Sequence, residues 1–284
     1  MAKRILIDGD WLVYTAGFAG QKTEYVYELG GENWVRGDTL TELKEIVGPT
    51  FNTAAVFSRV VCDPIEHVLH TAKLMLTKAV DAVTERLHAN SPDVTVFIDG
   101  DGNFRQKIAT IKPYKGNRIA AKPVLYSTIR EYLQEQWGAV LVHDQETDDA
   151  LSIEAWADPD VVIVGVDKDL LQIPALHYNP NKGFCKVTPE LGEALVYRQC
   201  LTGDVTDNIG GCYKAGPKRA HEVIRVTMFP EIKWAAVLKE YQASIDKYGE
   251  GLYNGLTAAE AAIENMRLVW LRHFPGEMWE PPAC

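Results

Sequence analysis

The sequence of 284 residues lacks several features that define common classes of protein. Its five cysteines are scattered and form no Cys-x-x-Cys pair, which argues for reduced thiols and against a zinc site. No apolar run approaches the roughly 20 residues of a membrane span. A strand is predicted directly after Met1–Arg4, so we expect no signal peptide. Internal repeats and low-complexity tracts are also missing. We therefore expect a soluble, cytoplasmic, globular protein.

Acidic residues are missing from one long stretch, although the net charge of the chain is −10. Between Gly102 and Arg130 there are seven basic residues and no acid. A solvated loop and helix face is the plain interpretation. In a chain with more acids than bases, we instead interpret the stretch as a phosphate-binding surface. Its basic residues are Arg105, Lys107, Lys112, Lys115, Arg118, Lys122 and Arg130.

Carboxylates are abundant directly after the predicted strands. Loops at the carboxyl ends of parallel strands share one edge of a sheet, so these acids should meet there. So many carboxylates close together repel one another and would stay partly protonated unless bound cations neutralise them. Hard oxygen ligands favour Mg²⁺ or Mn²⁺, which predicts a divalent-metal phosphoryl-transfer enzyme. The acids are Asp8, Asp10, Asp99, Asp101, Glu146, Asp148, Asp149, Asp167, Asp169, Asp204 and Asp207.

The order of the predicted elements indicates an α/β fold. Apolar runs predict strands that alternate with helices, which is typical of βαβ units, and so a central, mostly parallel sheet with helices on both faces. A polar, aromatic hairpin is predicted at 24–35. We expect an α/β core at 1–187 and a helical subdomain at 188–284. The predicted strands are 3–7, 94–99, 139–143 and 161–166, and the predicted helices are 63–88, 123–137, 148–157, 189–201, 217–227, 232–248 and 257–273, with a short helix from about residue 168.

Two further motifs suggest phosphate contacts. In Tyr114-Lys115-Gly116-Asn117-Arg118, an ammonium and a guanidinium could grip one phosphate from two sides, although a surface turn is equally compatible. Gly216-Pro217 marks a helix start after a glycine-rich turn. Such a turn offers backbone N–H groups to a phosphate, and Lys214, Lys218 and Arg219 add positive charge there.

Taken in order, these motifs resemble those of the 5′-nuclease superfamily, which includes flap endonucleases and phage 5′→3′ exonucleases. The motifs are Ile-Asp8-Gly, Val-Phe-Ile-Asp99-Gly, Tyr-Lys115-Gly-Asn-Arg118, Glu146-Thr-Asp148-Asp149, Val-Asp167-Lys-Asp169 and Gly-Asp204-Val-Thr-Asp207-Asn-Ile. The resemblance covers Ile5 to about Val223, and the short chain is most similar to a stand-alone bacteriophage exonuclease. It implies magnesium-dependent hydrolysis from 5′ ends of duplex DNA during DNA replication, by a monomer in the host cytoplasm.

The resemblance also implies a role for each motif residue. Asp8, Asp99, Glu146 and Asp148 would hold one metal ion, and Asp149, Asp167, Asp169, Asp204 and Asp207 would build or support the second position. Lys115 and Arg118 would contact the scissile phosphate under an arch at 102–130. A helix–turn–helix-like clamp at 203–223 would grip duplex backbone, with a monovalent cation such as K⁺ at 203–220. The residues expected to contact DNA are Tyr14, Tyr114, Lys112, Lys122, Gly211, Lys214, Gly216, Lys218 and Arg219, the two tyrosines by stacking on the terminal base.

The chain departs from the family pattern in two places. Lys214 replaces the first glycine of the usual Gly-x-Gly-Pro-Lys turn. Glycine readily adopts the left-handed backbone of this turn, on which the cation site depends, whereas lysine adopts it less easily. The stretch between Lys115 and Glu146 is short, and it must supply both the arch and the third predicted strand, which leaves little chain to enclose a threaded 5′ flap.

Other functions stay open from the sequence. A haloacid-dehalogenase-type phosphatase also begins with Asp-x-Asp, but Trp11-Leu12 follows here in place of the Thr or Val of that family. A non-catalytic DNA-binding relative is a second alternative. A dinucleotide-binding domain is excluded because no Gly-x-Gly-x-x-Gly follows the first strand. Exonuclease and flap endonuclease activity, and DNA and RNA–DNA hybrid substrates, remain alternatives.

Overall fold

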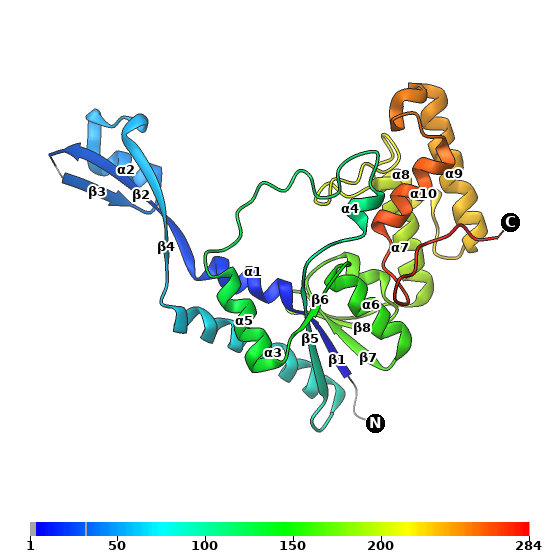
Figure 1. Cartoon of the computed structure of the whole chain (residues 1–284), viewed down its shortest axis with the longest axis horizontal. Helices are drawn as coiled ribbons and strands as arrows, with labels where there is room; N and C mark the ends of the chain where they lie inside the picture. Colours follow the sequence, from blue (N-terminus) through cyan, green and yellow to red (C-terminus); the bar gives the residue numbers. More distant parts are fainter. Residues whose placement is uncertain (1–3, 32, 284) are drawn as a thin grey trace. The chain divides into compact units, whose positions relative to one another are not determined.

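The computed structural model of the protein describes residues 4–31 and 33–283. Two compact units are formed from interleaved segments. The larger unit contains 4–10, 79–120 and 138–283, and the smaller contains 11–78 and 121–137. Helices α7 to α10 (yellow-green to orange-red in Figure 1) belong to the same unit as the parallel sheet. A division of function at residue 188 stays a prediction.

A six-stranded sheet, of which Figure 1 labels five strands, forms the centre of the larger unit. Its strand order is β6-β5-β1-β7-β8-β9. All neighbouring pairs are parallel except β8 and β9, which confirms the mostly parallel α/β sheet. The last two strands were not predicted, because their short mixed sequences lack the continuous apolar character of β1 and β7. The strands are β1 (Arg4–Asp8), β5 (Asp93–Asp99), β6 (Val140–Val142), β7 (Val161–Val164), β8 (Leu176–Asn179) and β9 (Gly183–Lys186).

Helices complete the larger unit, close to their predicted bounds. Helix α6 packs on β1 and β5, and α7, α9 and α10 pack on one another around buried Trp234, Tyr241 and Met266. This confirms the helical carboxyl-terminal region. The helices are α4 (Arg105–Ile108), α6 (Thr147–Ala157), α7 (Pro189–Thr202), α8 (Pro217–Val223), α9 (Pro230–Tyr248) and α10 (Ala258–Val269), with 3₁₀ turns η3 (Asp169–Gln172) and η4 (Glu250–Tyr253).

The smaller unit contains a three-stranded antiparallel sheet in the order β3-β2-β4. The hairpin of β2 and β3 confirms the predicted one, although Glu32 in its turn lies outside the described residues. Tyr27 is buried on this sheet, with its ring 5.5 Å from that of Phe51. The elements are α1 (Gly9–Ala19), β2 (Gln21–Gly30), β3 (Asn33–Gly37), α2 (Leu40–Val47), η1 (Gly48–Thr50), η2 (Thr53–Ala55), β4 (Val56–Cys62), α3 (Ile65–Leu87) and α5 (Tyr126–Trp137), of which α1 and α3 also contribute residues to the larger unit.

No helix among the described residues combines the length and apolarity that crossing a membrane requires.

Candidate active site

Four adjacent strands deliver acidic residues to one edge of the parallel sheet. Asp8 is the last residue of β1 and Asp99 the last of β5. Glu146 caps the start of α6 shortly after β6, and Asp167 follows β7. Because β6, β5, β1 and β7 are neighbours in the sheet, these acids lie along the same edge of the sheet, at the carboxyl ends of the strands.

Hydrogen bonds hold the centre of this acidic edge in place. The Asp10 N–H donates to Asp8 Oδ1 over 3.0 Å, and the Asp99 N–H donates to Asp10 Oδ2 over 2.7 Å. The Thr147 N–H donates to Asp99 Oδ1 over 2.8 Å, and its hydroxyl oxygen lies 2.9 Å from Asp99 Oδ1 and 3.0 Å from Asp10 Oδ2. Asp10 and Thr147 thus join the ends of β1 and β5 to the start of α6. The sequence predicts Asp10 as a member of the acidic cluster, but it gives no signal for the role of Thr147.

Like charges repel one another at this edge. Burial and the charges of Asp8 and Asp167 raise the pKa of Asp148 well above its usual range. Burial, with the charge of Asp167, also raises the pKa of Asp169 to about 6. Asp169 stays close to Asp167, since its N–H donates to Asp167 Oδ1 over 2.8 Å. Carboxylates held against their own repulsion are suited to binding a cation.

The predicted phosphate-contacting pair lies on this edge. Lys115 Nζ pairs with Glu146 and lies 3.9 Å from Asp207 Oδ2, and Arg118 Nη2 donates to Asp207 Oδ1 over 2.7 Å. The Lys115 N–H also donates to the Asp207 carbonyl over 2.8 Å, with Lys115 in the left-handed region at φ +55°. Burial alone would raise the pKa of Glu146, but the charges of Arg105 and Lys115 lower it. Lys115 and Arg118 therefore both pair with acids of this edge.

Tyr114 lies beneath this pair rather than on the surface. Its side chain is 7 % exposed and belongs to the core of the helical region. The hydroxyl oxygen lies 2.9 Å from Glu146 Oε2 and 2.8 Å from Asp207 Oδ2. A ring buried in this way has little surface for the predicted stacking on a base, and its hydroxyl positions the two acids instead.

Arg105 is buried and is not part of a phosphate-binding surface, which corrects the prediction for that residue. Its guanidinium, 1 % exposed, donates to both oxygens of Asp149 over 2.5 and 2.9 Å. It also donates to the carbonyls of Leu268 and Trp270 at the end of α10. Asp149 accepts further N–H groups from Glu146 and Arg272. A fully buried carboxylate with each oxygen accepting two protein hydrogen bonds has no lone pair directed to a metal.

The remaining acids, Asp204 and Asp207, lie in a loop between Gly203 and Gly211. Asp204 pairs with Lys168, and its backbone forms a bridge with Ile209. Gly203 and Gly211 face each other here at φ +66° and +62°. A Cβ on Gly203 would lie 2.2 Å from the Ile209 carbonyl oxygen, and one on Gly211 would lie 2.3 Å from the Gly203 nitrogen. Only glycine fits, so Gly211 shapes the loop that carries Asp204 and Asp207.

Comparison with solved structures gives the arrangement a family context. The bacteriophage T5 flap endonuclease, in a pseudo-enzyme–product complex with DNA and metal ions, matches with a TM-score of 0.55 at 15 % identity, over 94 % of this chain and 88 % of that chain. Zinc-bound T5 5′-exonuclease matches with a TM-score of 0.54 at 15 % identity, over 94 % and 89 %. A mutant of the T5 5′-exonuclease matches with a TM-score of 0.52 at 13 % identity, over 95 % and 88 %. The chain has the 5′-nuclease fold. The sequence itself matches no model of a known protein family and no curated protein.

Within this 5′-nuclease fold, the predicted DNA contacts lie in several places. Lys112, Lys214, Gly216 and Lys218 are exposed on the larger unit. Lys214 occupies the left-handed region at φ +64°, so the turn persists although lysine replaces the usual glycine. Arg219 is held by Glu240, with Nη2 and Nε donating over 2.5 and 2.9 Å, which reduces its availability for phosphate.

Two predicted DNA contacts belong to the smaller unit. Tyr14, 36 % exposed, has its ring 5.5 Å from that of Tyr126, and Lys122 Nζ lies 4.1 Å from the centre of the Tyr126 ring. A surface that combines aromatic faces with an ammonium is chemically compatible with a nucleobase and a phosphate.

The chemistry of the acids in the 5′-nuclease fold fits a hard divalent cation. All proposed donors are carboxylate oxygens, and the cationic side chains that contact them are fewer than the acids. Over 4–31 and 33–283, however, no three Asp, Glu, His or Cys side chains converge closely enough to hold a metal ion together. The ammonium groups of Lys115 and Lys168 contact Glu146 and Asp204 instead.

Proposed function

We propose that the protein is a divalent-metal-dependent 5′ nuclease that hydrolyses phosphodiester bonds from 5′ ends of duplex DNA. The observation that carries the proposal is the acidic edge of the sheet in a 5′-nuclease fold, with Lys115 and Arg118 paired to its acids. Related structures contain DNA and metal ions, which supports the same substrate and cofactor class here.

Metal binding is proposed for the acids that face the sheet edge. Asp8, Asp99, Glu146 and Asp148 would hold one Mg²⁺ or Mn²⁺ ion, with Asp167, Asp169, Asp204 and Asp207 around a second. Such ions supply a nucleophilic water at neutral pH and neutralise charge on the leaving oxygen. Asp149 is omitted from this set, because Arg105 occupies both of its oxygens. We propose that Asp149 instead fixes the start of α6, from which Glu146 and Asp148 project.

Lys115 and Arg118 would act on the scissile phosphate. Both already hold carboxylate oxygens of Glu146 and Asp207, so an entering phosphate offers the same kind of anionic partner. Negative charge grows on the phosphate oxygens as the bond breaks, and donors held there stabilise the transition state more than the ground state. The planar guanidinium fixes the phosphate orientation, while the ammonium contributes a point charge.

Further DNA contacts are proposed at exposed basic residues. Lys112, Lys214 and Lys218 would bind duplex backbone through phosphate charge, without reading the base sequence. Gly216 would allow the backbone to approach the DNA in the same turn, and Tyr14 with Lys122 would contact the strand near its 5′ end. We propose 5′→3′ exonuclease activity on DNA, and the alternatives are flap endonuclease activity and cleavage of RNA–DNA hybrids.

Digestion of 5′-labelled DNA tests the proposal. Blunt, nicked and flapped duplexes, with an RNA–DNA hybrid, are incubated with Mg²⁺, with Ca²⁺ or with excess EDTA, and product sizes are read on a gel. We expect short products from the 5′ end in Mg²⁺ and none in EDTA. Cleavage at the base of the flap would instead identify a flap endonuclease.

The variant Asp8→Asn separates binding from turnover. It removes one charged ligand and leaves the exposed lysines intact, so DNA binding in Ca²⁺ should persist while the rate falls by orders of magnitude. Persistent cleavage in EDTA, or normal cleavage by Asp8→Asn, would contradict the proposed metal centre. Absence of cleavage under every condition, with DNA bound normally, would favour the non-catalytic relative.

A further inference from the structure

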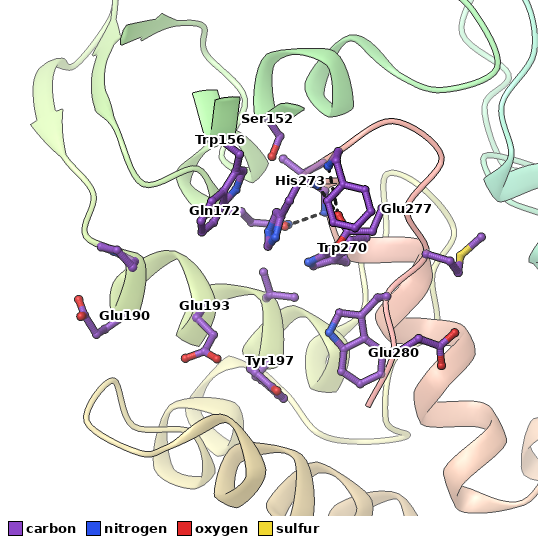
Figure 2. Close-up of a pocket in the computed structure, with 16 residues that line it drawn as sticks. Ser152, Trp156, Gln172, Glu190, Glu193, Tyr197, Trp270, His273, Glu277 and Glu280 are labelled. Carbon is purple, nitrogen blue, oxygen red and sulfur yellow. Dashed lines mark hydrogen bonds between the residues drawn. The ribbon is translucent and has the colours of Figure 1, made fainter. Parts of the chain in front are cut away.

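A pocket of about 780 Å³ opens on the larger unit, separate from the acidic edge of the sheet. Its walls come from α6, from α7 and from the segment that follows α10, as Figure 2 shows. None of the acids proposed to hold metal lines it, nor does any basic residue proposed to contact DNA. A volume of this size is in the range of sites that bind compact ligands or side chains.

Aromatic rings form much of the pocket wall. Trp156 is 45 % exposed and Phe274 is 57 % exposed, so two large rings stand partly in water. The Trp156 ring lies 4.2 Å from the imidazole of His273, which in turn lies 4.9 Å from the Trp270 ring. Gln172 closes one side, where its Oε1 accepts the Leu271 N–H over 3.1 Å. These contacts tie the aromatic rings to one another and to the segment that follows α10.

The charge of the lining is one-sided. It contains Glu190, Glu193, Glu277 and Glu280 but no lysine or arginine. Burial lowers the pKa of His273, so its imidazole adds no positive charge at neutral pH. Lys233 pairs with Glu193 and Arg267 with Glu280 from outside the lining. Across the described residues, Glu190 and Glu277 form no ion pair, although Glu277 accepts the His273 N–H over 2.8 Å. The pocket therefore keeps surplus negative charge beside aromatic faces.

One wall of the pocket already binds an ammonium group. Lys233 is fully buried, pairs with Glu193 and has its Nζ 5.9 Å from the centre of the Tyr197 ring. A cation held between an aromatic face and a carboxylate is favourable because the ring and the acid both attract it. Glu190, Glu277, Trp156 and Phe274 also line the pocket and offer the same two kinds of group.

From this charge complementarity we propose that the pocket binds a short basic segment of a partner protein, with a lysine or arginine side chain among the aromatic rings. Nucleic acid is disfavoured because its phosphates would face the glutamates. A small organic cation could meet only part of the charge, since the glutamates of α7 and those of the last segment lie apart around the pocket (Figure 2). A peptide segment with more than one positive charge could reach both the glutamates of α7 and those of the last segment. This site is independent of the proposed nuclease activity.

Selection from a phage-displayed library of random peptides tests the proposal. The library is selected on the wild-type protein and then depleted on the double variant Glu190→Gln/Glu277→Gln. We expect enrichment of sequences that combine lysine or arginine with apolar residues. A synthetic, fluorescein-labelled copy of the selected peptide should bind wild type at least tenfold more tightly than this variant, by fluorescence anisotropy. Trp156→Ala should weaken binding without any change in charge.

Matched controls separate a specific pocket from general attraction to an acidic protein. Glu135→Gln/Glu250→Gln makes the same change of net charge at exposed residues outside the pocket and should bind the peptide as wild type does. Thermal unfolding checks that each variant is folded. The proposal is overturned if no basic sequence is enriched, or if the two double variants bind equally. It is also overturned if tetramethylammonium or single-stranded DNA, at concentrations matched for ionic strength, displaces the peptide from the pocket.

Discussion

Two adjacent aspartates at the start of α6 belong to different electrostatic regions. Asp149 is buried and its charge is matched by the buried guanidinium of Arg105, with further N–H groups from the backbone. Asp148 faces Asp8, Asp167 and Asp169 and has its pKa raised by burial and by their charges. The same residue type is thus a structural anchor at one position and part of a cluster of mutually repelling acids at the next.

The difference shows how a fold can hold repelling acids in place. The Arg105–Asp149 pair joins the start of α6 to the carbonyls of Leu268 and Trp270, so that the carboxyl-terminal segment helps fix the helix. Its neighbours Glu146 and Asp148 can then remain at the sheet edge despite like charges around them. The stability of the first region should support the reactivity of the second.

The largest expected effect is on stability, from breaking the buried pair. Asp149→Asn leaves the Arg105 guanidinium buried without its counter-charge, and we expect a loss of about 3–5 kcal/mol in the free energy of unfolding. Asp148→Asn removes a repelling charge and should leave the metal-free protein equally stable or more stable. Urea unfolding of both variants in EDTA measures the contrast. Equal destabilisation would mean that the two acids do not differ in this way.

The next effect is on catalysis at the open region. Lys115→Ala should lower the single-turnover rate by roughly 10²–10³-fold, the scale of removing one transition-state donor. Arg118→Lys should also be slower, since an ammonium cannot replace the guanidinium. Affinity, measured as a binding isotherm in Ca²⁺, should change far less. Lys107→Ala, an exposed lysine of the same basic stretch, is the control and should keep its rate. A change confined to the isotherm would make Lys115 a binding residue only.

A smaller effect concerns the pH dependence of stability in EDTA. The folded protein raises the pKa of Asp169 to about 6, so between pH 4 and 6 it binds this proton more tightly than the unfolded chain. This contribution of Asp169 to stability is therefore present at low pH and lost as pH rises through 6, on the order of 3 kcal/mol in total. Urea unfolding from pH 4 to 7 should show a shallower decline for Asp169→Asn. Asp81→Asn, at an exposed position, should follow the wild-type curve.

The smallest effect is expected at the exposed lysines of the turn before α8 and of the start of that helix. Lys214→Ala/Lys218→Ala should weaken binding to all duplex sequences alike and lower the slope of log affinity against log salt by about one unit per lost contact. Lys182→Ala/Lys239→Ala makes the same charge change at other exposed positions of the larger unit and should keep the wild-type slope. An unchanged slope in the first variant would exclude a phosphate contact at this turn.

Much of the fold could be predicted because its signals are local. The apolar runs before Asp8 and Asp99 and the helix-start signature Gly216-Pro217 each depend on a few consecutive residues. The weak strands β8 and β9 could not be found, because their short sequences gain strand structure only by pairing at the edge of the sheet. The same holds for β4, which pairs with β2 across a long insertion.

The sequence by itself determined where acids follow strands, because the alternation of strand and helix implies a parallel sheet whose strand ends share an edge. It predicted a place at the metal centre for both Asp148 and Asp149, and it could not show that Arg105 is buried against Asp149. Tertiary structure decided both, since Arg105 meets Asp149 only when the basic stretch, α6 and the end of α10 pack together. Tyr114 likewise became a buried partner of Glu146 and Asp207 through that packing. A side chain's charge is local information, but the partner that neutralises it depends on contacts between residues far apart in the chain.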